Sequence, residues 1–342
     1  MSEITIYTLA KELNMTPSMI SRAFNPNARV NEEKRKIILE TAKKYGFSPN
    51  KFASRLSMEV VHIGVLINNK FQVNTDKMIL GLKSAHEELK DYKIQYDVTI
   101  LDPSKYSNEG IRQNLKRYKG YDGIIISGMS SAKDTDFINE LYDITPNVVQ
   151  VQAVNKDARC LLASKHNEET AAELAAEFLC NCLKKAERRT LLLFTGDLNS
   201  TLHKRASVAF NNFCAAMGLD LLSIVDMQDN EGYFEKILPS VFEQYGDQVD
   251  GIYITSGFSV PLCRYLERNN IDLSLVAFDT YDDIKQYMEK GIVTATISQD
   301  VTAQMKTAFQ LLVKHIIIGE KCPDVVYTDV QLVLKSNMHQ FN

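Results

Sequence analysis

The 342-residue chain lacks the features that mark membrane, metal-binding and disulfide-rich proteins. No apolar stretch approaches the length needed to span a bilayer, and the first fifteen residues lack the apolar core of a secretory signal. The six cysteines are scattered through apolar contexts, and the six histidines show no ligand spacing. We therefore expect reduced, buried thiols, no metal site, no cofactor and a cytoplasmic location.

The signatures of common enzymes are also missing. No G-x-G-x-x-G follows a strand pattern, and neither a P-loop lysine nor a G-x-S-x-G elbow is present. The neighbouring carboxylates Asp282 and Asp283 read as solvated residues in the first turn of a helix. Catalysis needs a nucleophile or an acid–base pair in a cleft, and the cleft candidates below are mainly hydrogen-bonding residues. The sequence thus predicts a protein that is not an enzyme.

Length and charge indicate two functional parts. A chain this long exceeds one typical core, so two or three compact units are expected. Residues 1–62 hold ten Lys/Arg and six Asp/Glu, a net charge of +4, which leaves 29 basic and 37 acidic residues, a net of −8, in the remainder. A modestly basic head on an acidic body fits attraction to phosphates at one end only. Because the head is not strongly basic, tight binding should need two copies.

The head shows three short helices in readable order. Thr5 can cap a first helix, and Thr16 caps a second that has Pro17 at its first position. Asn31 precedes a third helix whose first turn is acidic, and Gly46 supplies its C-terminal stop. This layout is that of an all-α helix-turn-helix module.

The second helix of such a module enters the major groove with its N-terminal residues. Ser18 and Arg22 lie four residues apart and share one face, so Arg22 can pair with a guanine edge. Ser21, Asn25 and Thr5 are short polar residues suited to phosphate oxygens. The alternative is an ordinary three-helix cap with solvated charges.

The run TLAKELNMTPSMISRAFNPNARVNEEKRKIILETAKKYGFSPNKFASRL resembles the N-terminal signature of the LacI/GalR family of bacterial transcription regulators. The resemblance implies a homodimer on a pseudo-palindromic DNA operator and a hinge helix and linker over residues 50–61. It also implies that Leu56 wedges between base pairs in the minor groove, near Ala53 and Arg55. In the alternative, Leu56 is a loop residue that packs on the next domain. The DNA-contact candidates are Thr5, Tyr7, Thr16, Pro17, Ser18, Ser21, Arg22, Asn25, Asn31, Asn50, Ala53, Arg55 and Leu56.

From residue 62 onward, apolar strand-like runs alternate with helical stretches, one of them from about Asp76 to Leu89. Strands that are apolar on both faces and separated by helices indicate doubly wound parallel sheets, and two such sets favour a two-lobed α/β domain. The predicted domains are 1–49 (helix-turn-helix), 50–61 (hinge) and 62–342 (effector binding and dimerisation), with a break near Lys156–Arg159. The first lobe would comprise about 62–157 and 296–324, and the second about 158–295 and 325–342.

Ligands of open α/β sheets bind beyond the carboxyl ends of the strands, so the polar residues that end the strands are the site candidates. A set of Asp279, Arg205, Asn69 and Phe71 would suit a sugar, whose hydroxyls need fixed hydrogen bonds and whose apolar ring face packs on an aromatic side chain. The effector-binding candidates are Asn69, Phe71, Ser127, Gln152, Arg205, Ser256, Asp279 and Gln299. Asn68, Thr195 and Gly196 also follow predicted strands.

This region resembles the type I periplasmic-binding-protein-like sensor of LacI/GalR regulators. The resemblance implies effector contacts at Arg205, Asp279 and Gln299, whereas Ser256–Gly257 departs from the Asn-Asp of many members. Each candidate has a plainer alternative: a surface ion pair for Arg205, a helix cap for Asp279 and lobe packing for Phe71.

We therefore expect a sequence-specific transcription regulator, usually a repressor, whose small-molecule effector is a sugar or sugar derivative bound between two lobes. Effector binding would change the spacing of the two hinges of a homodimer. The alternative is a cytosolic solute-binding or sugar-processing protein whose head does not bind DNA. The C-terminal LKSNMHQFN shows no heptads, so a coiled-coil tetramer is not expected.

Overall fold

The structure is a computed structural model that describes residues 6–24, 28, 30–45, 60–68, 71–101, 117–186 and 188–341. The chain divides into two compact units, one of Met1–Val60 with Lys90–Lys93 and one of Val61–Leu89 with Ile94–Asn342. Several predicted contacts lie outside the described residues, namely Thr5, Asn25, Asn50, Ala53, Arg55, Leu56 and Asn69.

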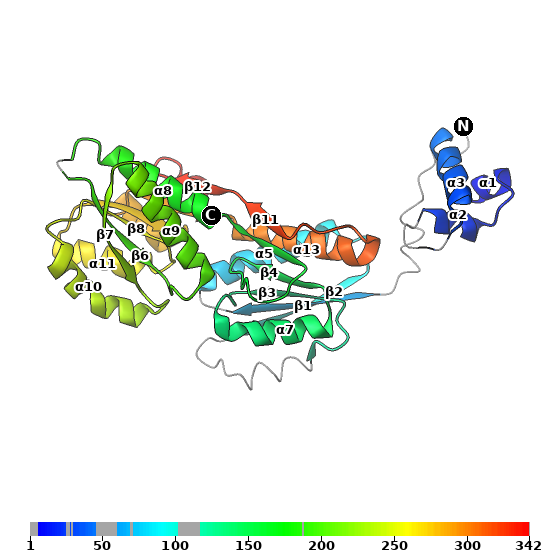
Figure 1. Ribbon diagram of the computed structural model, residues 1–342, viewed down its shortest axis with the longest axis horizontal. Helices are drawn as coiled ribbons and strands as arrows, with labels where there is room; N and C mark the ends of the chain where they lie inside the picture. Colours follow the sequence, from blue (N-terminus) through cyan, green and yellow to red (C-terminus); the bar gives the residue numbers. More distant parts are fainter. Residues whose placement is uncertain are drawn as a thin grey trace. The chain divides into compact units, whose positions relative to one another are not determined.

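The first unit contains three helices, α1 (Ile6–Glu12), α2 (Pro17–Ala23) and α3 (Glu32–Lys44), drawn in blue in Figure 1. A small apolar core joins them, with Leu9 of α1, Ile20 of α2 and Ile38 of α3 almost fully buried. The turn between α1 and α2 passes through Asn14, which has a φ of 49°, a left-handed conformation that Asn tolerates. The helices that the sequence predicts are thus present and pack on one another.

Side-chain caps fix where α2 and α3 begin. The Thr16 hydroxyl accepts a hydrogen bond from the Met19 backbone N–H at 3.3 Å. The side-chain oxygen of Asn31 accepts one from the Lys34 backbone N–H at 3.1 Å. Arg35 of α3 donates to the Ala23 carbonyl at 3.0 Å, which ties α3 to the end of α2. The predicted caps at Thr16 and Asn31 are confirmed, whereas the predicted cap at Thr5 lies outside the described residues.

The second unit contains two six-stranded sheets. The first sheet has the order β11-β5-β4-β3-β1-β2, and all of its pairings are parallel. Its strands are β1 (Val61–Asn68), β2 (Ile94–Leu101), β3 (Gly123–Ser127), β4 (Val148–Val151), β5 (Leu162–His166) and β11 (Val325–Thr328). Strands β3, β4 and β5 are buried along their whole length, as the apolar runs of β3 and β4 predict; β5 is buried although it carries Lys165 and His166.

The second sheet has the order β12-β10-β9-β8-β6-β7. Its strands are β6 (Thr190–Thr195), β7 (Asp220–Asp226), β8 (Gly251–Ile254), β9 (Ser274–Phe278), β10 (Ala295–Gln299) and β12 (Val330–Val333). All pairings are parallel except that of the edge strand β12, which runs antiparallel to β10. The predicted doubly wound sheets are therefore present, with one antiparallel edge that periodicity alone does not predict.

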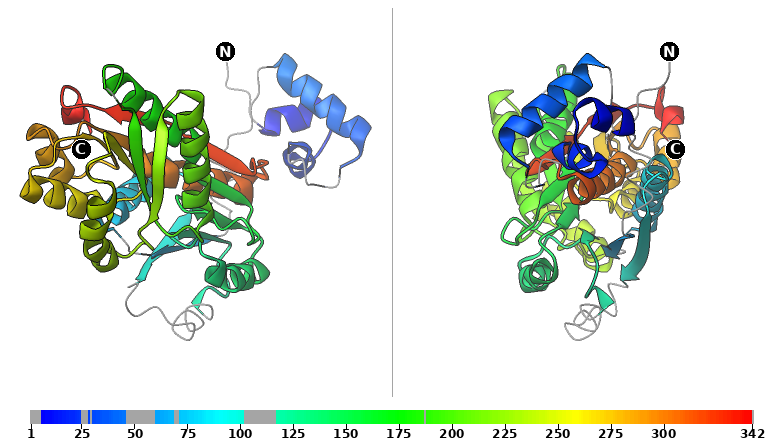
Figure 2. Two further views of the ribbon diagram at one scale, coloured as in Figure 1. Left: turned by 60° about the vertical axis from the view of Figure 1, so that its left-hand side comes forward. Right: turned by 90° about the vertical axis from the view of Figure 1, so that its right-hand side faces the viewer.

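Helices cover both faces of each sheet (Figures 1 and 2). In the first lobe, α5 (Gln72–Glu88) and α13 (Val301–Ile318) pack together on one face and α7 (Thr135–Ile144) covers the other. In the second lobe, α8 (Glu168–Cys182) and α9 (Thr201–Ala216) cover one face. The opposite face carries α10 (Glu231–Tyr245), α11 (Ser259–Asn269) and α12 (Asp282–Glu289). None of the helices in the described ranges is long and apolar enough to cross a membrane.

The lobe boundaries differ from the expected ones. The sequence places the first crossing near residue 157, whereas β5 still belongs to the first sheet and the chain crosses only after His166. Likewise β10 lies in the second sheet and β11 in the first, so the later crossings follow Gln299 and fall at Asp329. The polar stretch Lys156–Arg159 is a surface turn between β4 and β5, because polarity marks solvent exposure and not a change of lobe.

Candidate ligand-binding cleft

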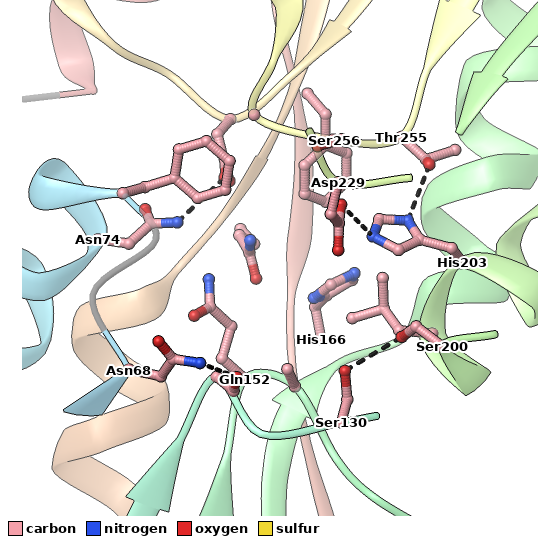
Figure 3. Close-up of a pocket in the computed structure, with 18 of the residues that line it drawn as sticks. Asn68, Asn74, Ser130, Gln152, His166, Ser200, His203, Asp229, Thr255 and Ser256 are labelled. Atoms are coloured by element: carbon pink, nitrogen blue, oxygen red, sulfur yellow. Dashed lines mark hydrogen bonds and ion pairs between the residues drawn. The ribbon is translucent and has the colours of Figure 1, made fainter. Parts of the chain in front are cut away.

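The carboxyl ends of the two sheets face one another across a cavity (Figure 3). The cavity between the lobes has a volume of about 100 Å³. In each sheet the chain order reverses at one point, between β1 and β3 in the first lobe and between β6 and β8 in the second. Loops diverge at such a point, which is where ligands of open α/β sheets bind.

The first lobe contributes polar side chains from successive strand ends. Asn68 ends β1 and donates its amide N–H to the Gly128 carbonyl at 2.9 Å. Gln152 follows β4 with a φ of 68°, and its backbone N–H is held by the Ser164 carbonyl at 2.9 Å. A left-handed glutamine is uncommon, and such backbone outliers gather at functional sites. His166 ends β5 and points into the centre of the cavity (Figure 3).

His166 lies in a dry environment. Its side chain is 2% exposed, and its ring packs against Phe278 with 5.4 Å between centroids. Burial lowers the pKa of His166, while the charges of Glu168 and Asp279 oppose that shift. The imidazole is therefore neutral at pH 7, and its Nδ1 has no hydrogen-bond partner.

The second lobe contributes a connected network. His203, at the start of α9, places Nε2 3.4 Å from an Asp229 carboxylate oxygen and Nδ1 3.1 Å from the Thr255 hydroxyl. Thr255 in turn contacts the Thr195 hydroxyl at 2.9 Å. A Cβ on Gly196 would collide with both His203 and Asp229, so only glycine fits beside this pair. The network orients His203 and leaves both of its nitrogens engaged.

Asp279 follows β9 and is 6% exposed, with a φ of 65°. One carboxylate oxygen accepts from the Tyr281 hydroxyl at 2.8 Å and from the Asn74 amide at 3.4 Å. Burial and the neighbouring Asp279 charge raise the pKa of Tyr281 well above its ordinary value, so this hydroxyl remains a donor. Tyr281, and not Asp279, occupies the residue before α12, which removes the helix-cap alternative for Asp279.

The lobes contact each other on two sides of the cavity. On one side the hydroxyls of Ser130 and Ser200 lie 3.1 Å apart. On the other, Phe71 of the first lobe packs on Phe258 of the second at a centroid distance of 4.9 Å, and stacks at 6.5 Å on Tyr281. These aromatic rings and the Asn74–Asp279 hydrogen bond close that side of the cavity.

The structure brings together most of the predicted effector residues. Phe71, Gln152, Ser256, Asp279 and Gln299 all line the cavity. Two described candidates, Ser127 and Arg205, do not line it, and Asn69 lies outside the described residues. Ser127 is buried within the first lobe.

Arg205 is placed elsewhere. It lines a separate depression beside α8 and forms an ion pair with Glu169 at 3.0 Å, in which both side chains are about half exposed. This is the plain surface pair that the sequence left open as an alternative. Arg205 does not reach the cavity between the lobes.

Sequence reasoning missed several cavity residues, namely Asn74, Ser130, His166, Ser200, His203, Asp229 and Thr255. One sequence signal could have indicated His166. The strand that begins in the run LLAS continues through Lys165, so His166 is the polar residue at its carboxyl end. His203 and Asp229 have none, because they come from a helix start and a loop where no periodicity marks an inward side chain.

The arrangement suits hydrogen bonding to a small molecule. Within the described parts of the chain, no group of three or more His, Cys, Asp or Glu residues could hold a metal ion. The lining combines amides, hydroxyls, imidazoles and two carboxylates with aromatic rings at one side, and these groups can form hydrogen bonds with a small polar molecule.

Residues 65–321 match the family described as a periplasmic binding protein domain. Catabolite control protein A of Staphylococcus xylosus is 32% identical over 231 residues, 67% of each chain. Among solved structures, a protein of Bacteroides fragilis assigned as a LacI transcriptional regulator superposes with a TM-score of 0.72 at 18% identity, over 83% of this chain and all of that one. The glucose-galactose binding protein GanP of Geobacillus stearothermophilus gives 0.72 at 20% identity, over 82% of this chain and 99% of that one.

The fold and cleft thus define a periplasmic-binding-protein domain. Together with the catabolite control relative, they show that the chain belongs to the LacI/GalR family of regulators. The alignments with other curated relatives span about half the length of those proteins, 43% and 52%.

Proposed function

We propose that the chain is a sequence-specific DNA-binding transcription regulator, a repressor, which acts as a homodimer on a pseudo-palindromic operator. A sugar or sugar derivative that binds between the lobes would control it. The observation that carries the proposal is the pairing of a capped three-helix head with a polar interlobe cavity in one chain of this family.

The face of α2 that the sequence assigns to DNA is solvated. Ser18, Ser21 and Arg22 are exposed, whereas Ile20 and Ala23 on the opposite side are buried in the head core. Tyr7 of α1 is 71% exposed, so its side chain is accessible to a partner. This geometry supports a helix-turn-helix interface in which Arg22 reads a base edge and its neighbours position the backbone.

The cavity supports effector control by lobe movement. Residues from both lobes line it, and contacts such as Ser130–Ser200 and Asn74–Asp279 form only when the lobes approach each other. A ligand that bridges the lobes therefore favours one interlobe arrangement over others. In a homodimer this shift would alter the spacing of the two hinge segments, with a coupling of about 1–3 kcal/mol that acts equally on DNA and effector.

Selection from random duplex DNA tests the DNA-binding part. We expect the purified protein to enrich a twofold-symmetric site, and Arg22→Ala to lose about 1–3 kcal/mol of specificity at one position of each half-site. Lys44→Ala, at the far end of α3, is the matched control for loss of one positive charge. Failure to enrich any sequence refutes the proposal and leaves the second candidate.

Leu56→Ala tests the hinge. The variant should bind the selected site more weakly, because the side chain would no longer prop open a base step, while the sensor keeps its thermal stability. An unchanged affinity for the selected site would remove the wedge from the proposal.

A screen of sugars by thermal shift tests the cleft. The stabilising sugar should lose its effect on Asp279→Ala, since that carboxylate lies in the cavity wall. Retained stabilisation would exclude Asp279 from the site. The second candidate is a solute-binding protein whose head does not bind DNA, and the superposition with a sugar-binding protein favours it. That candidate predicts sugar binding without any selected DNA site.

A further inference from the structure

Within the described ranges the chain passes between the lobes three times, and each crossing is a single residue long. Asn167 lies between β5 and α8, Asp300 between β10 and α13, and Asp329 between β11 and β12. These are the first, second and third crossings, and at the third β11 leads directly into β12 (Figure 1). A one-residue link has only two soft dihedral angles, so any movement of the lobes is absorbed by these residues and their neighbours.

A buried ion pair spans the first crossing. Lys165, next to last in β5, places Nζ 2.6 Å from a carboxylate oxygen of Glu168, the first residue of α8, and the two side chains are 7% and 3% exposed. The ring of Tyr327, which pairs with Lys165 in the sheet, lies 5.6 Å from the same Nζ. The Asn167 side chain accepts from the Glu169 backbone N–H at 3.0 Å, which fixes the start of α8 directly after the link. The ammonium and the carboxylate thus tie the end of a first-lobe strand to the start of a second-lobe helix.

The other two crossings are held by weaker contacts. At the second crossing the Gln304 side-chain amide of α13 donates to the side-chain oxygen of Gln299 in β10 at 3.2 Å, a bond between neutral groups. At the third crossing Asp329 is exposed, and the buried Thr328 hydroxyl oxygen beside it has no hydrogen-bond partner in the described part of the chain. Hydrogen bonds between charged groups are the stronger ones, and a stranded buried charge costs more than a stranded amide. The first crossing therefore resists deformation most.

Separating the pair would cost more than an effector supplies. If α8 turned away from β5, an ammonium and a carboxylate would lose each other where little water reaches, and the loss of one partner of a buried pair shifts a folding equilibrium by a factor on the order of several hundred. Glu168 has no spare hydrogen bond to compensate, because its second carboxylate oxygen already lacks a partner among the described residues. The coupling between an effector and a conformational change is typically about 5- to 150-fold. Lobe movement therefore leaves the pair intact.

We propose that the Lys165–Glu168 pair is the pivot of lobe movement: the first crossing keeps its geometry, and the lobes turn about it by bending at the second and third crossings. The pair thereby confines the lobes to one path of opening and closing. This inference goes beyond the proposed function and is tested on the chain without effector or DNA, so its failure leaves the proposed function untouched.

Distance distributions between the lobes test the pivot. Spin labels are attached by oxime chemistry to a ketone-bearing amino acid that replaces the exposed Asp136 of α7 and Lys236 of α10, which leaves the native cysteines unlabelled. The labelled full-length chain is diluted with unlabelled chain, so that double electron–electron resonance reports distances within one protomer. The test variant, Lys165→Met/Glu168→Met, replaces both charges by apolar side chains of similar length, an exchange that often leaves a fold as stable as before.

We expect a narrow distribution for the wild type and a broader one for the double variant. Arrangements that the pair excludes should become more than about tenfold more populated, because they no longer strand two buried charges. Lys285→Met/Asp282→Met is the matched control. It removes a pair of the same three-residue spacing from α12, where the atoms lie 3.5 Å apart and the Asp282 side chain is 95% exposed, and it should leave the distribution unchanged.

Three results overturn the proposal. Equal widths for the wild type and the double variant would show that the pair does not confine the lobes, and equal broadening in the control would remove the special role of the first crossing. A longer mean distance at wild-type width would show that the pair holds the lobes closed and breaks on opening. If the double variant does not fold, Glu168→Gln is measured in its place, since it keeps an oxygen for Lys165 but removes the negative charge. An unchanged width in that variant also overturns the pivot.

Discussion

Adding one methyl group at Gly257 should act as a spacer between the lobes. Gly257 follows β8 in the second lobe, and a Cβ there would lie 2.6 Å from the Tyr281 hydroxyl. It would also lie 3.0 and 3.1 Å from two ring carbons of Phe71, which belongs to the first lobe. Real Cβ contacts rarely fall below 3.4 Å, so the Phe71 ring and its lobe must move away or the aromatic packing must break.

The expected magnitude follows from overpacking. Inserting a methyl group into a well-packed contact costs about 1–3 kcal/mol. In Gly257→Ala the nearest atom, the Tyr281 hydroxyl of the same lobe, is the far end of a side chain that can shift, so most of this cost falls on the Phe71 contact where the lobes meet. The effector would then bind roughly 5- to 150-fold more weakly, while the ligand-free protein unfolds at nearly the wild-type temperature.

Titration with the monosaccharide that most stabilises the wild type measures this effect. Gly232→Ala is the matched control, because it adds the same methyl group to the same lobe where the nearest atom is 3.7 Å away. Wild-type affinity in Gly257→Ala would show that Phe71 and Tyr281 do not pack on Gly257 in the bound state. A large fall in unfolding temperature without ligand would also refute the reasoning, since the cost would then lie within the fold.

Three further predictions concern charged groups. Arg205→Ala should leave effector affinity within about twofold of wild type, because its partner is the half-exposed Glu169 and surface pairs contribute little; a tenfold loss on titration would return Arg205 to the site. Lys165→Met should lower the free energy of unfolding by about 3–5 kcal/mol in urea melts, since it strands the buried Glu168 carboxylate that lies 2.6 Å from Lys165; a loss below about 1 kcal/mol would contradict this. Burial lowers the folded pKa of His166 below its unfolded value near 6.5, so its contribution to stability should decline as the pH falls through that value, and His166→Phe should flatten the pH dependence of unfolding between about pH 7 and 5; an identical profile in both proteins would exclude His166 as the cause.

The sequence predicts the alternating strands and helices well because both-face burial leaves continuous apolar runs, as in GIIIS of β3 and SLVAF of β9. It also predicts cavity residues where a polar residue directly follows such a run, as Asp279 and Gln299 do. It does not predict which strand joins which sheet, since the pairing of β5 with β4 and of β6 with β8 depends on long-range contacts that no local pattern encodes. His203 and Asp229 depend on the same tertiary placement, so no local pattern reveals them.

The crossings between lobes bear on synthesis as well as on ligand binding. Strand β11 joins the first sheet beside β5, although more than 150 residues and a complete second sheet core lie between them in sequence. A nascent chain therefore cannot complete either edge until β11 and β12 have left the ribosome, and until then one side of β5 remains unpaired. Any fragment that ends before Val325 would expose that side as a template for pairing with a second molecule.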